Sequence, residues 1–136
     1  GATWTAQNSR ERSDGETDTA IEHFAHAMRL SPLDPELYRM QAGMALAHLF
    51  IGDPDTALSW AEKAVRDLPD FMLAISVLAA SHALAGRLSE AQRAVHQLRQ
   101  LDPALRLSNL TDWLPIQRPE NLATFVDGLR RAGLPE

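Results

Sequence analysis

The sequence predicts an all-α fold, an α-α superhelix of about three helix pairs with a C-terminal capping helix. The first observation behind this prediction is a glycine followed five residues later by an alanine, a block that recurs at steps of 37 and 34 residues with Gly15, Gly52 and Gly86. The second is a proline twelve residues after each of these alanines. Internal periodicity of this length is typical of stacked helical units that bury their apolar faces against one another.

The second helix of each expected pair carries small residues where it should cross its neighbours. Alanine at a crossing lets two helix backbones approach closely, and the preceding glycine can take the left-handed conformation that ends a helix. The proline ends the second helix because it has no N–H to donate to an interior hydrogen bond. The expected repeat-packing residues are Ala20, Phe24, Ala27, Ala57, Ala64, Ala91, Pro32, Pro69 and Pro103.

We expect three repeats, at residues 1–34, 35–70 and 71–103. In the second repeat the first helix should follow Asp34 as N-cap, with a proline at its first position, and should end at Ile51.

The first helices of the other two repeats differ in how well they fit the pattern. In the third repeat this helix should span about residues 71–85. The first repeat looks degenerate, because Trp4 is in place but the packing positions that follow it hold polar residues such as Gln7 and Glu11.

The repeats give way to a C-terminal cap at residues 104–136. A short helix is expected at about 108–114 with Ser108 as its cap, and a final helix at about 119–132 ended by Gly133. A cap is needed because a stack of repeats must cover its last open face. Whether the final helix only closes the third repeat or also enters the groove of the stack stays open at this point.

The repeat pattern, read as Ala20, Phe24, Ala27 and Pro32, resembles the second helix of a tetratricopeptide repeat. The tail contains the segments Ser108-Asn109-Leu110, Trp113-Leu114-Pro115, Arg118 to Leu122 and Gly128 to Glu136. With these segments after the repeats, it resembles the C-terminal regions of bacterial class III adenylate cyclase-like proteins and of related regulators with a winged-helix output domain. The resemblance implies a regulatory end without cyclase chemistry, since the catalytic residues of that family belong to an upstream domain.

Composition excludes several functional classes. The net charge of −5 and the scattered arginines offer no basic surface for nucleic acid. The most apolar stretch, residues 72–85, is too short to cross a membrane, which takes about 20 residues. With no cysteine, the chain has no disulfide or thiolate chemistry and fits the cytoplasm. Because it begins Gly1-Ala2 without a methionine or a leader, we expect a segment of a longer protein.

The histidines and carboxylates do not form a pattern that predicts catalysis. His23 and His26 lie three residues apart, but no third ligand follows at a metal-site spacing. His48 and His82 occupy equivalent repeat positions, where packing and a hydrogen bond explain them better than proton transfer. We therefore expect no catalytic residue, no cofactor and no metal in this segment, although a full-length parent could be a nucleotide cyclase.

The first helices of the repeats should line a mostly apolar concave groove. Carried over from the tetratricopeptide family, the expected binding positions are Arg39, Leu46, Leu49, Phe50, Leu73, Val77 and Leu84. An exposed apolar groove needs a cover, for which the candidates are residues 104–136, a second copy of the chain or an external partner. The sequence thus favours a non-catalytic protein-protein interaction or assembly module that binds a protein or peptide. A structural homodimerisation spacer for an upstream output domain is the alternative.

Overall fold

A computed structural model describes residues 17–110, 114, 116 and 118–136, and its regular structure in these ranges is entirely helical. The predicted all-α fold is therefore confirmed. A first helix covers residues 17–30. The helices that follow it are α2 (Leu37–Phe50), α3 (Pro54–Asp67), α4 (Met72–Leu84), α5 (Leu88–Leu101), α6 (Leu107–Leu110) and α7 (Pro119–Ala132).

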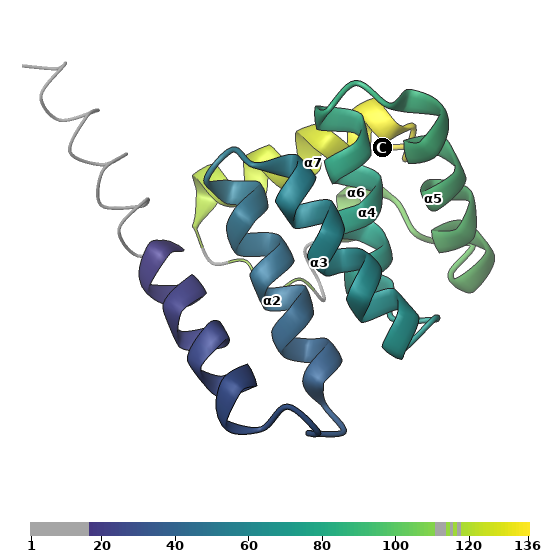
Figure 1. Cartoon of the computed structure of the whole chain (residues 1–136). Helices are drawn as coiled ribbons and strands as arrows, with labels where there is room; N and C mark the ends of the chain where they lie inside the picture. The colour runs from purple at the N-terminus through teal and green to yellow at the C-terminus, as the bar shows by residue number, and fades with distance from the viewer. Residues whose placement is uncertain (1–16, 111–113, 115, 117) are drawn as a thin grey trace, which may run out of the picture.

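The helices pack in the order of the chain, as stacked helix pairs do. Figure 1 shows the helix of residues 17–30, α2, α3, α4 and α5 side by side in one row. Each of the helices from α2 to α5 packs on the next one along the chain, and α2 also reaches α4. The last helix, α7, lies behind this row in the view of Figure 1 and packs mainly on α4. The chain thus folds back so that its end covers one of its own middle helices.

Alanines make the close helix crossings at the centre of the stack. Ala57, Ala61 and Ala64 of α3 are completely buried, and so is Ala91 of α5. A methyl group is the largest side chain that such a close approach of backbones leaves room for. In the helix of residues 17–30 the expected packing residues Ala20, Phe24 and Ala27 are only half-buried, whereas the three prolines follow their helices in exposed turns.

Glycine ends the first helix of two repeats at the expected places. Gly52 and Gly86 have φ angles of +88° and +86°, in the left-handed region that other residues avoid. After Gly52, the side chain of Asp53 caps the N-terminus of α3. Asp53 accepts a hydrogen bond from the backbone N–H of Thr56 at 3.2 Å and another from its hydroxyl at 2.6 Å. These bonds hold the pKa of the Asp53 carboxyl below its usual value.

The corresponding turn after Gly86 uses a different contact. Arg87 stands where the earlier repeat has its capping aspartate, and it makes no cap bond. Instead its Nε donates to Nδ1 of His82 at 3.0 Å, and its terminal nitrogen donates to Asp55 at 3.0 Å. Arg87 therefore ties the end of α4 to the beginning of α3.

Two predicted helix starts need correction. Asp34 does accept a hydrogen bond from the backbone N–H of Glu36 at 2.8 Å, but residues 35 and 36 form a turn and α2 begins at Leu37. Ser108 is not a cap, since α6 already begins at Leu107.

The chain itself supplies the polar contacts at the start of α6. Oδ1 of Asn109 accepts from the backbone N–H of Arg106 at 2.9 Å. The N–H groups of Leu107 and Ser108 donate to the carbonyls of Pro135 and Glu136 at 2.8 and 3.2 Å. The C-terminus thus takes up donors at the start of α6 that a local cap would otherwise serve.

The α3 crossing can be tested by overpacking it. Ala57→Trp should lower the free energy of unfolding by about 1–3 kcal/mol or more, because the larger side chain has no space between the helices. Ser59→Trp places the same side chain on the exposed face of the same helix and serves as the control. Urea unfolding followed by circular dichroism measures both, and equal stabilities would contradict the assigned crossing.

The contact between Arg87 and His82 predicts a dependence of stability on pH. Burial, and secondarily the positive charge of Arg87, lower the pKa of His82 in the folded state. The unfolded chain therefore takes up the proton first, so stability should fall as pH drops through about 6.5, the ordinary histidine value. The urea midpoint should decrease more between pH 7.5 and 5.5 in the parent than in His82→Gln. An equal decrease in both proteins would refute the role given to His82.

Candidate protein-binding pocket

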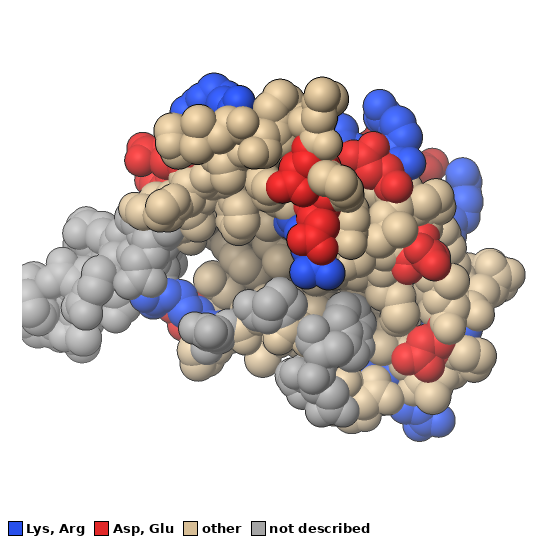
Figure 2. Space-filling model, turned by 90° about the horizontal axis from the view of Figure 1, so that it is seen from below, with Lys and Arg blue, Asp and Glu red and all other residues tan. Residues whose placement is uncertain are grey.

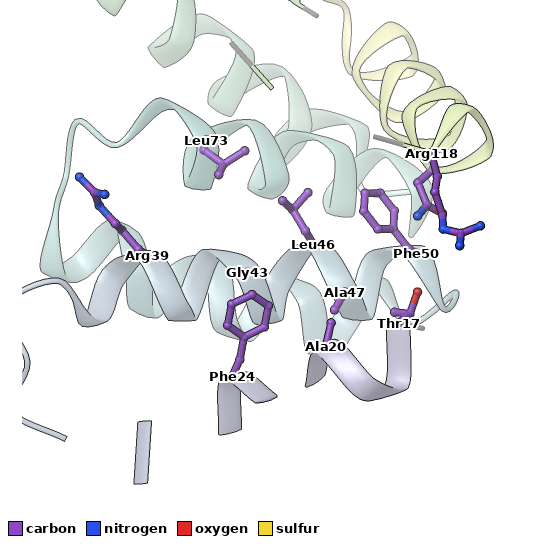
Figure 3. Close-up of a pocket in the computed structure, with 11 residues that line it drawn as sticks. Thr17, Ala20, Phe24, Arg39, Gly43, Leu46, Ala47, Phe50, Leu73 and Arg118 are labelled. Atoms are coloured by element: carbon purple, nitrogen blue, oxygen red, sulfur yellow. The ribbon is translucent and has the colours of Figure 1, made fainter. Parts of the chain in front are cut away.

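A cavity of about 400 Å³ opens between the helix of residues 17–30, α2 and the beginnings of α4 and α7 (Figure 3). Seen from the end of the molecule at which α2 begins, the surface is visibly hollowed (Figure 2). The lining residues are Thr17, Ala20 and Phe24 from the first helix, Arg39, Gly43, Leu46, Ala47 and Phe50 from α2, Leu73 from α4, and Arg118 and Asn121 from the start of α7.

Four of the seven predicted groove residues meet in this pocket. Three of them, Arg39, Leu46 and Phe50, come from α2, and Leu73 comes from the first turn of α4. Leu46 is largely covered by its neighbours, whereas Phe50 and Leu73 are half-buried. The pocket therefore corresponds to the α2 part of the predicted groove.

The other three predicted groove residues do not line the pocket. Val77 is completely buried and Leu49 is 2% exposed, so both belong to the core and not to an accessible surface. Leu84 is half-buried and packs against the same core. Val77 and Leu49 are therefore not the accessible groove residues that were predicted. At Val77 the reason is that the tail covers this face of α4, which a position within a repeat does not reveal.

The C-terminal helix α7 covers the face of α4 on which the predicted groove residue Val77 lies. Phe125 and Leu129 of α7 are fully buried in the same cluster as Val77. Gly128 allows the close contact, since a Cβ atom there would lie 2.9 Å from the Cβ and 3.1 Å from the Cα of Ala80. Of the other tail residues considered for this cover, Leu114 is half-buried against the core, while Trp113 lies outside the described residues. The final helix thus covers the face of the first helix of the third repeat, α4.

Beside the pocket, a large and a small residue are exchanged between repeats where the helix of residues 17–30 crosses α2. The ring of Phe24 lies over Gly43 so closely that a Cβ on Gly43 would be 2.5 Å from the Cζ atom of the ring. One repeat later the corresponding residues are Ala61 and Val77, a small one and a larger one. Where the helix of residues 17–30 crosses α2, the half-exposed ring of Phe24 thus fills the space over Gly43.

Within the described part of the lining, the ionisable residues are both arginines. Arg39 contacts Glu36 at 3.6 Å and lies 5.9 Å from the centre of the Tyr38 ring. Arg118 contacts Glu120 at 3.4 Å. In Figure 3 these two arginines stand toward opposite ends of the pocket, with the apolar residues between them. Such a lining suits an apolar group with negative charge near its ends.

Among the described residues that line the pocket, none has a carboxylate, imidazole or thiol that could act as a general acid or base near neutral pH. His23 and His26 are exposed on the first helix, outside the lining. Over the described part of the chain, no three histidine, aspartate or glutamate side chains come together as a metal site would require.

The lining residues that sequence reasoning missed include Thr17, Ala47, Arg118 and Asn121. Thr17 comes from the first turn of the described helix, and Arg118 and Asn121 come from the beginning of α7. No repeat position identifies the last two, because they reach the pocket only through the fold of the tail. Ala20 and Phe24 were expected only as packing residues.

The comparisons do not assign a family. No protein-family model matches the chain, and a search of curated proteins found no match. Within the described residues, no helix is both long and apolar enough to cross a membrane.

The contact of α7 with α4 can be tested at the glycine. Gly128→Leu should lower the free energy of unfolding by about 1–3 kcal/mol, because its side chain would collide with the backbone of Ala80. Ala123→Leu adds the same side chain to the exposed face of α7 and controls for the effect of an added leucine on this helix. Thermal unfolding compares the two, and a Gly128→Leu protein as stable as Ala123→Leu would disprove the packing.

Proposed function

We propose that this chain is a non-catalytic protein-protein interaction or assembly module of the tetratricopeptide type, and that the pocket beside α2 is its binding site. The observation that supports this most is the apolar cavity of about 400 Å³ on the stretch of α2 that α7 leaves uncovered. Exposed apolar surface bordered by polar residues is typical of a binding site on a soluble domain. The proposal includes no catalytic residue and no cofactor.

The size of the pocket suits the large side chains of a peptide or helix. Full burial of one leucine or phenylalanine side chain contributes about 1.5–3 kcal/mol. Two such anchors would contribute roughly 3–6 kcal/mol before the entropy of association is subtracted, a range suited to reversible binding.

We further propose that the module is the C-terminal regulatory segment of a cytoplasmic bacterial signalling protein such as an adenylate cyclase. The support is the sequence of the tail, whose first and last motifs meet in space. The N–H of Ser108 in the first motif donates to the carbonyl of Glu136 in the last, and the N–H of Leu107, just before the first motif, donates to the carbonyl of Pro135. The tail therefore folds as one unit with the repeats, as a dedicated C-terminal module should.

A homodimerisation spacer for an upstream output domain is the second candidate. Leu30 is 70% exposed and Leu33 is 94% exposed, at the end of the first helix and in the turn that follows it. Large apolar side chains with this much exposure suit a contact between two copies of the chain.

The binding role can be tested with a charged substitution in the pocket. Leu73→Asp introduces a carboxylate into the first turn of α4, where a negative charge is favourable for the helix. Leu88→Asp makes the same change at the first position of α5, outside the pocket, and is the matched control.

Two measurements compare the variants with the parent. Binding of the apolar dye 1-anilinonaphthalene-8-sulfonate should fall several-fold in Leu73→Asp alone, and light scattering should show whether its mass changes. Loss of a dimer in Leu73→Asp would favour the spacer. Unchanged dye binding and unchanged mass together would rule out the pocket as a binding site.

A further inference from the structure

We propose that the turn between α4 and α5 is an acid-sensitive latch: Arg87 holds this turn to the beginning of α3 while His82 is neutral, and protonation of His82 releases it. The proposal concerns regulation of the fold and goes beyond the proposed binding function. Three observations carry it: a chain of two hydrogen bonds, the charges that act on His82, and the contrast with the same position one repeat earlier.

The first observation is that the side chain of Arg87 bridges two helices. Its Nε donates to Nδ1 of His82, near the end of α4, at 3.0 Å. Its terminal nitrogen donates to the carboxylate of Asp55, in the first turn of α3, at 3.0 Å. A guanidinium stays protonated in proteins and can only donate. Nδ1 of His82 is therefore the acceptor, and the proton of the neutral ring is on Nε2.

Protonation of His82 removes the acceptor of the first bond. The added proton occupies Nδ1, so the imidazolium and the guanidinium then face each other with N–H donors and positive charges on both sides. The ion pair that remains to Arg87 is exposed, since the side chain of Asp55 is 76% accessible. Solvent makes such pairs weak, so this one does not hold Arg87 against a cation in direct contact with it.

The charges that act on His82 set the direction of the response. Burial, and then the positive charge of Arg87, lower the pKa of His82, whereas Glu90 of α5 and Glu62 of α3 oppose this effect. From α2 and α7, which also pack on α4, no described charged group acts on His82. The ring is therefore neutral at pH 7.5 and takes up its proton only below about 6.5, the ordinary histidine value. The latch is closed at neutral pH and opens as the pH falls further.

The second repeat has the same histidine without the latch. His48 is equivalent to His82, and Asp53 is equivalent to Arg87. Asp53 instead caps α3 through Thr56, and Nδ1 of His48 has no hydrogen-bond partner among the described residues. A carboxylate attracts an imidazolium, whereas Arg87 repels one. The second repeat therefore provides an internal control with the opposite charge beside the ring.

Release of Arg87 should loosen the joint between two repeats without unfolding the core. The bridge connects α3 of the second repeat to the α4–α5 turn of the third. The other contacts of α3 with α4 belong to the apolar core, which contains Ala57, Ala61 and Ile75 and has no group that titrates. The expected change is therefore a local opening of the turn, distinct from the loss of overall stability.

Hydrogen-deuterium exchange of the full chain at pH 7.5 and 5.5 tests the latch, with each rate corrected for the intrinsic pH dependence of amide exchange. We expect the protection of residues 83–90 to fall several-fold more than that of residues 125–132 in α7. In His82→Gln the protection of the turn should stay the same at both pH values, because an amide oxygen can accept from Arg87 and does not titrate. A response that persists in this variant, or an equal loss of protection in α7, would overturn the inference.

His48→Gln is the matched control, because it makes the same change at the equivalent position of the second repeat. The acid response of residues 83–90 should remain in this variant. If it disappears there as well, the response comes from the loss of a packed histidine and not from Arg87, and the latch is wrong.

Nitrogen NMR of the histidine rings gives a second test that does not depend on the folding of the His82 variant. In the parent at pH 7.5 the proton of His82 should be on Nε2, and in Arg87→Gln the titration of His82 should move to higher pH because a positive charge is lost. A proton on Nδ1 in the parent, or a titration that Arg87→Gln leaves unchanged, would show that Arg87 does not control this ring.

Discussion

The close crossing of helices at alanine is the contact on which the rest of the structure depends. Ala57, Ala61 and Ala64 give α3 a face with no side chain larger than a methyl group, and all three are fully buried. This lets α2 and α4 approach α3 from either side, and the larger residues beside the crossings then interlock into one core. The left-handed glycines after α2 and α4 bring the chain back at the angle that these crossings require.

The same constraint explains where the surface is covered and where it is open. On α4, small residues such as Ala80 leave room for a further helix, and Gly128 lets α7 fill that room. On α2, the position equivalent to Ala80 holds the larger residue Leu46, which borders the pocket. The apolar face of the row is thus divided into a part closed by the chain itself and a pocket with an arginine toward each end.

Most of the fold could be predicted from the sequence because its determinants are local. The glycine and proline positions mark the ends of α2 to α5 to within about two residues, and Pro119 and Gly133 mark α7. What could not be predicted depends on long-range contacts. The bonds from α6 to the carbonyls of the last two residues replace the cap expected from Ser108, and the position of α7 buries Val77. The pocket was only partly predictable for the same reason, since Arg118 and Asn121 reach it through the fold of the tail.

Hydrogen-deuterium exchange read by mass spectrometry tests the central claim most directly, namely that α7 is an integral layer of the stack that closes the face of α4. The account predicts that amides in residues 125–132 exchange as slowly as those of α4, because both helices lose their protection only when their shared interface opens. Complete exchange of α7 within seconds, while α4 stays protected, would contradict it, since the face of α4 would then be open and the pocket would extend along the whole row.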